Sequence, residues 1–339
     1  MNNRYSRQIL FTPIGESGQT NIGKKHVLII GAGALGSMNA EMLVRAGIGK
    51  LTIIDRDYVD WSNLQRQQLY TEQDVIEHMP KAIAAKQRLE LINKKIVIDV
   101  YAEDASITLL KRLADETDLI VDATDNFETR FIINDIAQKY SIPWIYGACI
   151  GSYGLCYTIL PGETACLSCL VERIPVGGAT CDTAGILSPA VSMVVSYQVS
   201  EALKLLSENR DALRRELVSF DIWKNEYSSL NVQGFKKTDC LSCGLEAIYP
   251  YLQEENISKT AILCGRDTVQ IRPSYKRVVN LQEQARVLHG YVKDLVYNPY
   301  LLSFQTGENR IVLFKDGRVL VHGTKNITEA KTLYHRYFG

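Results

Sequence analysis

The sequence predicts an α/β protein with a doubly wound, mainly parallel sheet and a small α+β appendage at the C-terminal end. Two observations predict the sheet: apolar strand-like runs alternate with helical segments, and a glycine-rich turn joins the first strand to the first helix. Paired short apolar runs beyond residue 300 predict the appendage. The 339 residues suffice for two domains, which we expect over residues 1–245 and 246–339.

The sheet elements follow one another in a regular order. Helices are expected at 34–45 and 127–140, and another near Pro80, since proline suits the first helical position. Five short apolar runs have the composition of buried strands and occupy residues 27–30, 51–54, 118–122, 142–148 and 154–160.

The second part of the chain is less regular. Residues 161–185 form a crossover rich in glycine and cysteine, and Ser188 is expected to cap a long helix with Pro189 in its first turn. In the appendage, a closing helix is expected to start at Asn326. Three short strands precede it, at 301–305, 310–314 and 318–322.

Composition excludes several classes of partner. Lysine plus arginine and aspartate plus glutamate both number 38, so no bulk field attracts nucleic acid or an anionic membrane. The N-terminal residues lack an apolar core of signal-peptide length, and no apolar run is long enough to span a bilayer. We therefore expect a cytoplasmic protein, in which the eight cysteines do not form a disulfide framework and any that cluster serve as metal ligands or a working thiol.

A G-x-G-x-x-G turn lies between the first strand and the first helix. Gly31 permits the tight turn, Gly33 lets a phosphate approach the backbone, and Gly36 lets the helix, which begins at Ala34, pack on the strand. Asp55, at the end of the next strand, is placed to bond ribose hydroxyls. This pattern predicts an adenine nucleotide, either ATP or NAD; the alternative is a glycine turn kept for packing alone.

A polar tract after Asp55 favours a triphosphate. Nucleophilic attack at an α-phosphate adds negative charge that cations or a metal must neutralise. Arg66 offers a planar fork of donors to phosphate, and Asn63 and Gln65 add neutral donors. Lys81 lies in the first turn of a helix, where the helix dipole disfavours a cation unless an anion compensates. The alternatives are a solvated surface lysine and a surface ion pair of Arg66.

Asp125 supplies charge of the opposite sign at the carboxyl end of a buried strand. A carboxylate there could bind Mg²⁺ that bridges phosphates, with Asp122 as the alternative ligand. Asn126 could orient the nucleotide, and Arg130 could pair with Glu128 or Asp125. Alternatively, Asp125 is the N-cap of the following helix.

Two C-x-x-C pairs predict a structural zinc site. A gap of two residues lets both thiolates of a pair face one ion, and four thiolates leave no open coordination position. A disulfide or free thiols are the alternatives. The four ligands are Cys166, Cys169, Cys240 and Cys243.

Cys181 stands outside both pairs. Its neighbours are glycines, Asp182 and Thr183 rather than an apolar run, which fits an exposed thiol as well as a filler residue. The three remaining cysteines, Cys149, Cys156 and Cys264, lie in or near apolar strands and are expected in the core.

Several short motifs along the chain occur in the order "RYSRQ", "GAGALGS", "SNLQRQ", "PKA", "DATDN", the two "CLSC" pairs and "TCDTAG". Together these motifs resemble those of the ThiF/MoeB/HesA adenylyltransferases, bacterial relatives of ubiquitin-activating enzymes. The resemblance covers about residues 4–245. It implies an enzyme that uses ATP and Mg²⁺ to adenylate the C-terminal glycine of a ubiquitin-like sulfur carrier ending in Gly-Gly. The carrier then receives sulfur as a thiocarboxylate for thiamine thiazole or molybdopterin, and the sequence leaves the choice of pathway open.

The resemblance also implies roles for individual residues. Asp125 becomes the metal-linked aspartate closest to a catalytic role. Arg7 matches an arginine that reaches the neighbouring subunit's site, which implies a homodimer, and Cys181 matches a cysteine that can link covalently to the carrier. The ribose ligand is Asp55, and the ATP contacts are Ser62, Asn63, Leu64, Gln65, Arg66 and Lys81.

The C-terminal segment does not resemble the rhodanese domain that ends many longer relatives. Its single cysteine after the second pair, Cys264, is followed by "GRDT", so sulfur is expected from a separate cysteine desulfurase or rhodanese. The segment instead resembles the extension of Bacillus-type members. Two other functions remain as alternatives: an NAD-dependent oxidoreductase, and a non-catalytic scaffold for a ubiquitin-like partner.

Overall fold

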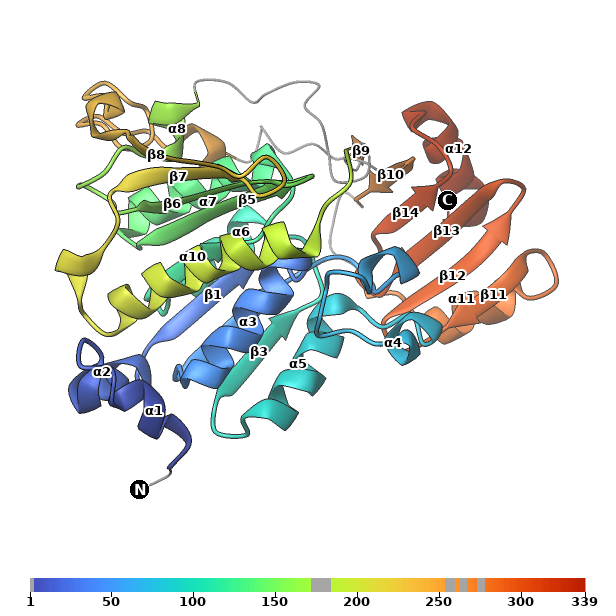
Figure 1. Ribbon diagram of the computed structural model, residues 1–339. Helices are drawn as coiled ribbons and strands as arrows, with labels where there is room; N and C mark the ends of the chain where they lie inside the picture. Colours follow the sequence, from blue (N-terminus) through green and yellow to red (C-terminus); the bar gives the residue numbers. More distant parts are fainter. Residues whose placement is uncertain (1–2, 172–183, 254–259, 263–266, 273–277, 339) are drawn as a thin grey trace. The chain divides into compact units, whose positions relative to one another are not determined.

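A computed structural model describes residues 3–171, 184–253, 260–262, 267–272 and 278–338 (Figure 1). The chain forms two compact units. The first comprises Met1–Val75 and Pro80–Glu254, and the second comprises Ile76–Met79 and Glu255–Gly339. A short piece of the early chain thus belongs to the C-terminal unit. None of the described helices is long and apolar enough to cross a membrane.

The first unit is built on an eight-stranded sheet of order β3-β2-β1-β4-β5-β6-β7-β8. The five strands from β3 to β5 are parallel, and β6, β7 and β8 continue the sheet in antiparallel fashion. The chain winds outward from β1 to β3 and then returns to β4, so the winding reverses between β1 and β4. In such sheets a ligand binds outside the carboxyl ends of the strands at this reversal. The strands are β1 (His26–Ile30), β2 (Lys50–Ile54), β3 (Val97–Tyr101), β4 (Leu119–Asp122), β5 (Trp144–Ile150), β6 (Tyr153–Ile159), β7 (Glu216–Asp221) and β8 (Glu226–Asn231).

Helices cover both faces of this sheet. In Figure 1, α3 (Ala34–Ala46), α5 (Lys81–Ile92) and α10 (Ser188–Leu206) lie on one face, and α6 (Ile107–Ala114) and α7 (Phe127–Tyr140) lie on the other. The predicted doubly wound α/β fold is confirmed. The shorter helices are η1 (Asn3–Tyr5), α1 (Ser6–Ile9), α2 (Gly15–Ile22), η2 (Trp61–Asn63), α4 (Glu72–Ile76), α8 (Leu167–Leu170), η3 (Arg210–Ala212), η4 (Gln233–Phe235) and η5 (Pro250–Leu252).

The central strands form where apolar residues run without interruption. All residues of β1 and β4 are buried, as expected for parallel strands covered on both faces. The sequence analysis missed β3, β7 and β8. β3 and β8 are the two edges of the sheet, and every residue of β8 is exposed, so neither strand carries a continuous apolar run.

Two predicted helix starts are wrong by one residue. Pro80 is the N-cap of α5 and not its first helical residue. Ser188 is the first residue of α10, whose N-cap is Leu187, and no side chain caps this end of the helix. Pro189 does lie in the first turn, where its missing N–H costs nothing.

The second unit is an antiparallel sheet of order β11-β12-β13-β14-β10-β9 with two helices. Apolar side chains of β12, β13 and β14 pack with those of both helices, and the closing helix α12 (Ile327–Phe338) starts as expected at Asn326. Its other elements are β9 (Thr260–Ile262), β10 (Thr268–Ile271), α11 (Leu281–Leu288), β11 (Lys293–Tyr297), β12 (Leu301–Thr306), β13 (Asn309–Phe314) and β14 (Val319–His322).

Candidate nucleotide site and cysteine cluster

The glycine turn after β1 has the geometry of a phosphate cradle. Gly31 has φ +97°, and a Cβ there would lie 2.4 Å from the carbonyl oxygen of Ala123. A Cβ on Gly36 would lie 1.8 Å from the carbonyl oxygen of Gly31, so only glycine lets α3 pack on the turn. A Cβ on Gly33 would meet no atom closer than 3.9 Å. The open space at Gly33 is where a phosphate could approach.

The N-terminus of α3 is available to an anion. Its N-cap is Gly33, which has no side chain to accept from the first-turn amides. These amides therefore remain donors, and the helix dipole favours negative charge beside them.

Asp55 connects the glycine turn to the end of β2. Its two oxygens accept the N–H groups of Ala32 at 2.6 Å and Asp57 at 2.7 Å. Burial raises the pKa of the Asp55 carboxyl, and the Lys81 ammonium opposes this shift. Each carboxylate oxygen has a second acceptor position, so Asp55 can still accept bonds from ribose hydroxyls.

Lys81 is buried, with 3% of its surface exposed, so its interpretation as a solvated surface lysine is wrong. Its Nζ atom lies 3.5 Å from Asp57 Oδ2, and its backbone N–H donates to the Asp57 carbonyl oxygen at 2.9 Å. Asp57 therefore provides the compensating anion that the helix position requires. A buried ammonium beside the glycine turn and Asp55 can also bind a phosphate.

The polar tract forms the turn around η2. Arg66 donates through Nη1 to the Ser62 carbonyl oxygen at 2.7 Å and makes no ion pair with the described residues. Asn63 is fully buried, and its Oδ1 accepts the N–H of Asp60 at 3.1 Å. The side-chain carbonyl group of Asn63 thus stabilises the turn. Of the other tract residues, Ser62 and Gln65 are exposed and Leu64 is half-buried.

Gln67 is a further candidate site residue, one that was not among those expected from the sequence. It is 3% exposed, its Oε1 atom has no hydrogen-bond partner among the described residues, and its Nε2 atom lies 3.9 Å from the Cβ position of Gly33. A buried amide oxygen that lacks a donor fits a site that a hydrogen-bond donor of a ligand completes. Its position directly after Arg66 was the one signal in the sequence.

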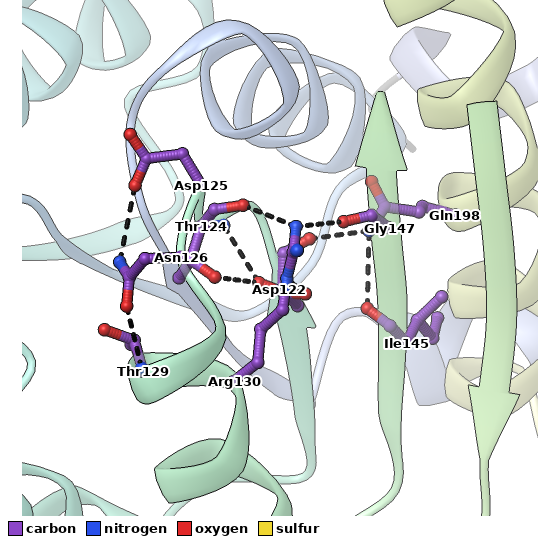
Figure 2. A network of polar contacts seen from close by, with 9 residues as sticks. All are labelled: Asp122, Thr124, Asp125, Asn126, Thr129, Arg130, Ile145, Gly147 and Gln198. Carbon is purple, nitrogen blue, oxygen red and sulfur yellow. Dashed lines mark hydrogen bonds and ion pairs between the residues drawn. The ribbon is translucent and has the colours of Figure 1, made fainter. Parts of the chain in front are cut away.

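The loop after β4 presents Asp125 to solvent. Asn126 Oδ1 accepts the N–H of Thr129 at 2.8 Å and caps α7, while its Nδ2 donates to Asp125 Oδ1 at 3.3 Å (Figure 2). The interpretation of Asp125 as the N-cap is therefore wrong. In Figure 2 the exposed Asp125 carboxylate points away from the buried network, and its other oxygen is available to a ligand.

Asp122 and Arg130 form a buried ion pair beneath this loop (Figure 2). Arg130 Nε donates to Asp122 Oδ2 at 3.0 Å, and Thr124 donates to Asp122 Oδ1 through its N–H at 2.9 Å and its hydroxyl at 2.7 Å. The expectation that Arg130 pairs with Glu128 or Asp125 is wrong, because packing places its guanidinium against Asp122. With both oxygens engaged at full burial, Asp122 is poorly suited to bind a metal.

Three further hydrogen bonds stabilise the loop. Arg130 Nη2 donates to the carbonyl oxygens of Thr124 at 2.7 Å and Gly147 at 3.1 Å. From α10, Gln198 Nε2 donates to the Asp122 carbonyl oxygen at 2.8 Å. Removing one partner from such a buried network typically costs about 3–5 kcal/mol. The position of Asp125 is therefore held by groups that no local motif reveals.

Arg56 joins the ends of β2 and β4 electrostatically. Burial lowers its pKa, but the carboxylates of Asp104, Asp57 and Asp125 outweigh this and raise it. Its Nη1 atom lies 3.1 Å from Asp104 Oδ1. The charges of Asp57 and Asp125 thus surround a common region, in which the structure brings together the glycine turn, Asp55 and Lys81.

Arg7 is not brought to this region by its own chain. It is exposed on α1, next to Gln8, whose Nε2 donates to the carbonyl oxygen of Ala46 at 3.0 Å. Ala46 is the last residue of α3, whose first residue adjoins Gly33. At 1.5 Å per residue, the length of α3 separates the two sites by about 20 Å.

The four paired cysteines form one cluster. The Sγ atom of Cys166 lies 3.8 Å from the Sγ atom of Cys169 and 3.7 Å from that of Cys240. The Sγ atoms of Cys169 and Cys243 lie 3.5 Å apart. A disulfide needs about 2.05 Å, so that alternative is wrong. Four sulfurs placed about 2.3 Å from a tetrahedral zinc ion are about 3.8 Å apart. The cluster therefore fits a metal ion with a closed coordination shell.

The cluster joins two distant segments. Cys166 is the N-cap of α8 and Cys169 lies within that helix, and the Lys237 N–H donates to Cys169 Sγ at 3.5 Å. Such amide–sulfur contacts orient and stabilise metal-bound thiolates. The Cys181 thiol, for which a covalent role was considered, lies outside the described residues.

The sequence profile described as the ThiF family matches residues 5–242, which include the glycine turn, Asp125 and all of the cluster except Cys243. The chain belongs to the ThiF family. It is 52% identical over the full length of both chains to the sulfur carrier protein ThiS adenylyltransferase of Bacillus subtilis. It is 35% identical to the protein of the same name from Escherichia coli, over 71% of this chain and 94% of that protein.

A solved structure with a similar fold agrees with the architecture of this ThiF family chain. The crystal structure of E. coli MccB with ATP superposes with a TM-score of 0.62 over 72% of this chain and 74% of the other, at 21% identity. At that identity the likeness concerns the fold alone.

Proposed function

We propose that this protein adenylates the C-terminal glycine of a ubiquitin-like sulfur-carrier protein of the ThiS or MoaD kind, using ATP and releasing pyrophosphate. The observation that carries the proposal is the open cradle at Gly33, with the buried Lys81 ammonium and the exposed Asp125 carboxylate in the same region. The relatives named ThiS adenylyltransferases from Bacillus subtilis and Escherichia coli support it.

The reaction requires no side-chain nucleophile. A carboxylate oxygen of the carrier's terminal glycine attacks the α-phosphate, an acyl–phosphate bond forms, and the bond to the β-phosphate oxygen breaks to release pyrophosphate. The protein contributes positioning and charge stabilisation. The amides of the glycine turn and the cations of Arg66 and Lys81 would hold the phosphates, and Asp55 would hold the ribose.

The exposed carboxylate of Asp125 fits a magnesium ion. Mg²⁺ in nucleotide sites is usually bound by one or two carboxylates together with substrate phosphates, and it neutralises charge that develops on them. Among the described residues, Asn126 donates to one Asp125 oxygen, which orients the side chain and leaves the other oxygen for the ion. The ion bound by the cysteine cluster would be zinc with a purely structural role.

We propose that the active form is a homodimer in the cytoplasm. Arg7 lies too far from the cradle of its own chain, so its role in catalysis would require a second copy that places it in the partner's site. A separate cysteine desulfurase or rhodanese would supply sulfur, and Cys181 would be the residue that links to the carrier. Residues 1–245 would carry the adenylation activity, with 246–339 as a separate domain.

ATP–pyrophosphate exchange tests the proposal. Exchange should depend on a carrier that ends in Gly-Gly, and Asp125→Asn should reduce it by about three orders of magnitude, the scale expected for a lost electrostatic contact to the transition state. Glu128→Gln is the matched control and should retain near-normal exchange. Failure of every Gly-Gly carrier to support exchange would refute the proposal, and tight binding of NADH in place of ATP would favour an oxidoreductase.

A further inference from the structure

A short segment of the early chain belongs to the second compact unit. Residues Ile76–Met79 begin with the last residue of α4 and precede Pro80, the N-cap of α5. Lys81, the buried lysine of the nucleotide site, is the first residue of that helix. The segment held by the second unit is therefore covalently continuous with a phosphate-binding candidate.

Asn298 makes polar contacts that hold this segment. Its Nδ2 atom donates to the carbonyl oxygens of Glu77 at 2.9 Å and His78 at 3.2 Å. Its Oδ1 atom accepts the N–H groups of Tyr300 at 2.8 Å and Leu301 at 2.9 Å. One half of the side chain thus shapes the turn between β11 and β12, while the other half binds the segment.

The segment has a conformation that needs such support. His78 has φ +49°, in the left-handed region that non-glycine residues rarely occupy. Residues in such conformations persist only where their surroundings hold them. Between His78 and Lys81 stand the buried Met79 and Pro80, whose ring restricts φ. A displacement of the His78 carbonyl would therefore be transmitted to the first turn of α5.

We propose that Asn298 is a positioning residue for Lys81, and that through it the second unit stabilises the nucleotide-binding conformation of α5. Asn298 acts through the backbone of residues 77–80. The inference rests on the proposed function only where exchange kinetics are the readout, because ATP binding can be measured without a carrier.

The substitution Asn298→Asp separates the two halves of the side chain. The carboxylate keeps the acceptor for the β11–β12 turn, but it replaces the amide donor with an oxygen that repels the two carbonyl groups. Asn326→Asp in the full-length chain is the matched control. Asn326 Oδ1 accepts the N–H groups of Thr328 and Glu329, and aspartate caps a helix equally well.

The dissociation constant for ATP·Mg should rise about tenfold in Asn298→Asp, which corresponds to the loss of one to two hydrogen bonds. In Asn326→Asp the dissociation constant should change less than about twofold. In exchange assays the KM for ATP should rise while the KM for the carrier stays unchanged. Amide hydrogen exchange in a peptide covering residues 77–85 should accelerate only in Asn298→Asp.

Thermal unfolding checks that each variant is folded, and Asn298→Ser, which keeps a shorter acceptor, serves if the aspartate variant does not fold. A folded Asn298 variant with unchanged ATP affinity overturns the proposal, as does an equal loss of affinity in the Asn326 control. If the wild type binds ATP but shows no exchange with any carrier, the proposed function fails, and the comparison of ATP affinities still decides the role of Asn298.

Discussion

Gly33 and Gly36 belong to one turn, yet the space around them differs. A Cβ on Gly36 would overlap a carbonyl oxygen, whereas a Cβ on Gly33 would enter open space, although the ψ of −146° at Gly33 lies outside the regions that other residues favour. Glycine is therefore required at residue 36 by packing within the protein. At residue 33 packing does not require glycine; the backbone conformation favours it, and a ligand that approaches the backbone would also do so.

Alanine substitutions separate these two requirements. Gly33→Ala should lose less stability than Gly36→Ala but bind ATP·Mg at least about tenfold more weakly, because the methyl group occupies the phosphate space. Gly36→Ala should lose more than about 3 kcal/mol of stability, because overlap with the Gly31 carbonyl forces the backbone to move. Calorimetric unfolding and ATP titration measure both effects. Normal ATP affinity of Gly33→Ala would exclude a phosphate at that position.

At the scale of the element, β1 begins with a histidine that the site does not use. His26 is 5% exposed, its Nδ1 lies 2.7 Å from the Glu116 carbonyl oxygen, and its Nε2 lies 2.8 Å from Thr52 Oγ1. A carbonyl can only accept, so Nδ1 carries the proton and Nε2 accepts from the hydroxyl. Burial lowers the pKa of His26, and the neutral form is preferred in the folded state.

This preference makes stability depend on pH. The pKa of His26 in the folded state is below the unfolded value of about 6.5. The contribution of the neutral His26 side chain to folding stability is therefore present above about pH 6.5 and is lost as pH falls through the folded-state pKa. The free energy of unfolding should therefore decrease as pH falls below about 6.5, and His26→Gln should flatten this part of the profile. Urea unfolding at several pH values tests this. The exposed His289→Gln control should keep the wild-type slope; an unchanged slope in His26→Gln would contradict the assignment.

We expect the cysteine cluster to stabilise the segment around α8 only when a metal ion is bound. We expect one zinc ion per chain, and removal by a strong chelator should lower the unfolding temperature by about 10 °C, because metal binding free energy contributes directly to folding. Cys240→Ser should lose the metal, whereas Cys149→Ser, outside the cluster, should retain it. Elemental analysis and thermal unfolding measure both. A metal-free wild type with the same unfolding temperature would rule out a structural metal site.

At the scale of the whole molecule, the distance between Arg7 and the glycine turn decides whether one chain is sufficient. If the partner supplies Arg7, then Arg7→Ala and Asp125→Asn should each be nearly inactive alone. Mixed dimers of the two variants contain one intact site, so an equimolar mixture should recover about a quarter of wild-type exchange activity. Verified mixed dimers without activity would show that the sites are not shared.

Local patterns were sufficient for much of the fold and site. The apolar runs of β1, β2 and β4, the glycine turn and the two C-x-x-C pairs are encoded within a few residues, and the structure contains all of them. The cysteine pairs also predicted a contact between segments far apart in the chain, because four thiolates with metal spacing require one ion.

Tertiary structure alone decided how the polar groups pair. The sequence offers Arg130 three nearby carboxylates, and only packing of α7 against β4 selects Asp122. Likewise, Asn126 rather than Asp125 caps α7, Lys81 is buried beside Asp57, and Gln198 braces β4 from 76 residues away. Periodicity and spacing specify which face of an element is buried. The partner of a buried charge depends on which elements meet there, and that is settled when the chain packs.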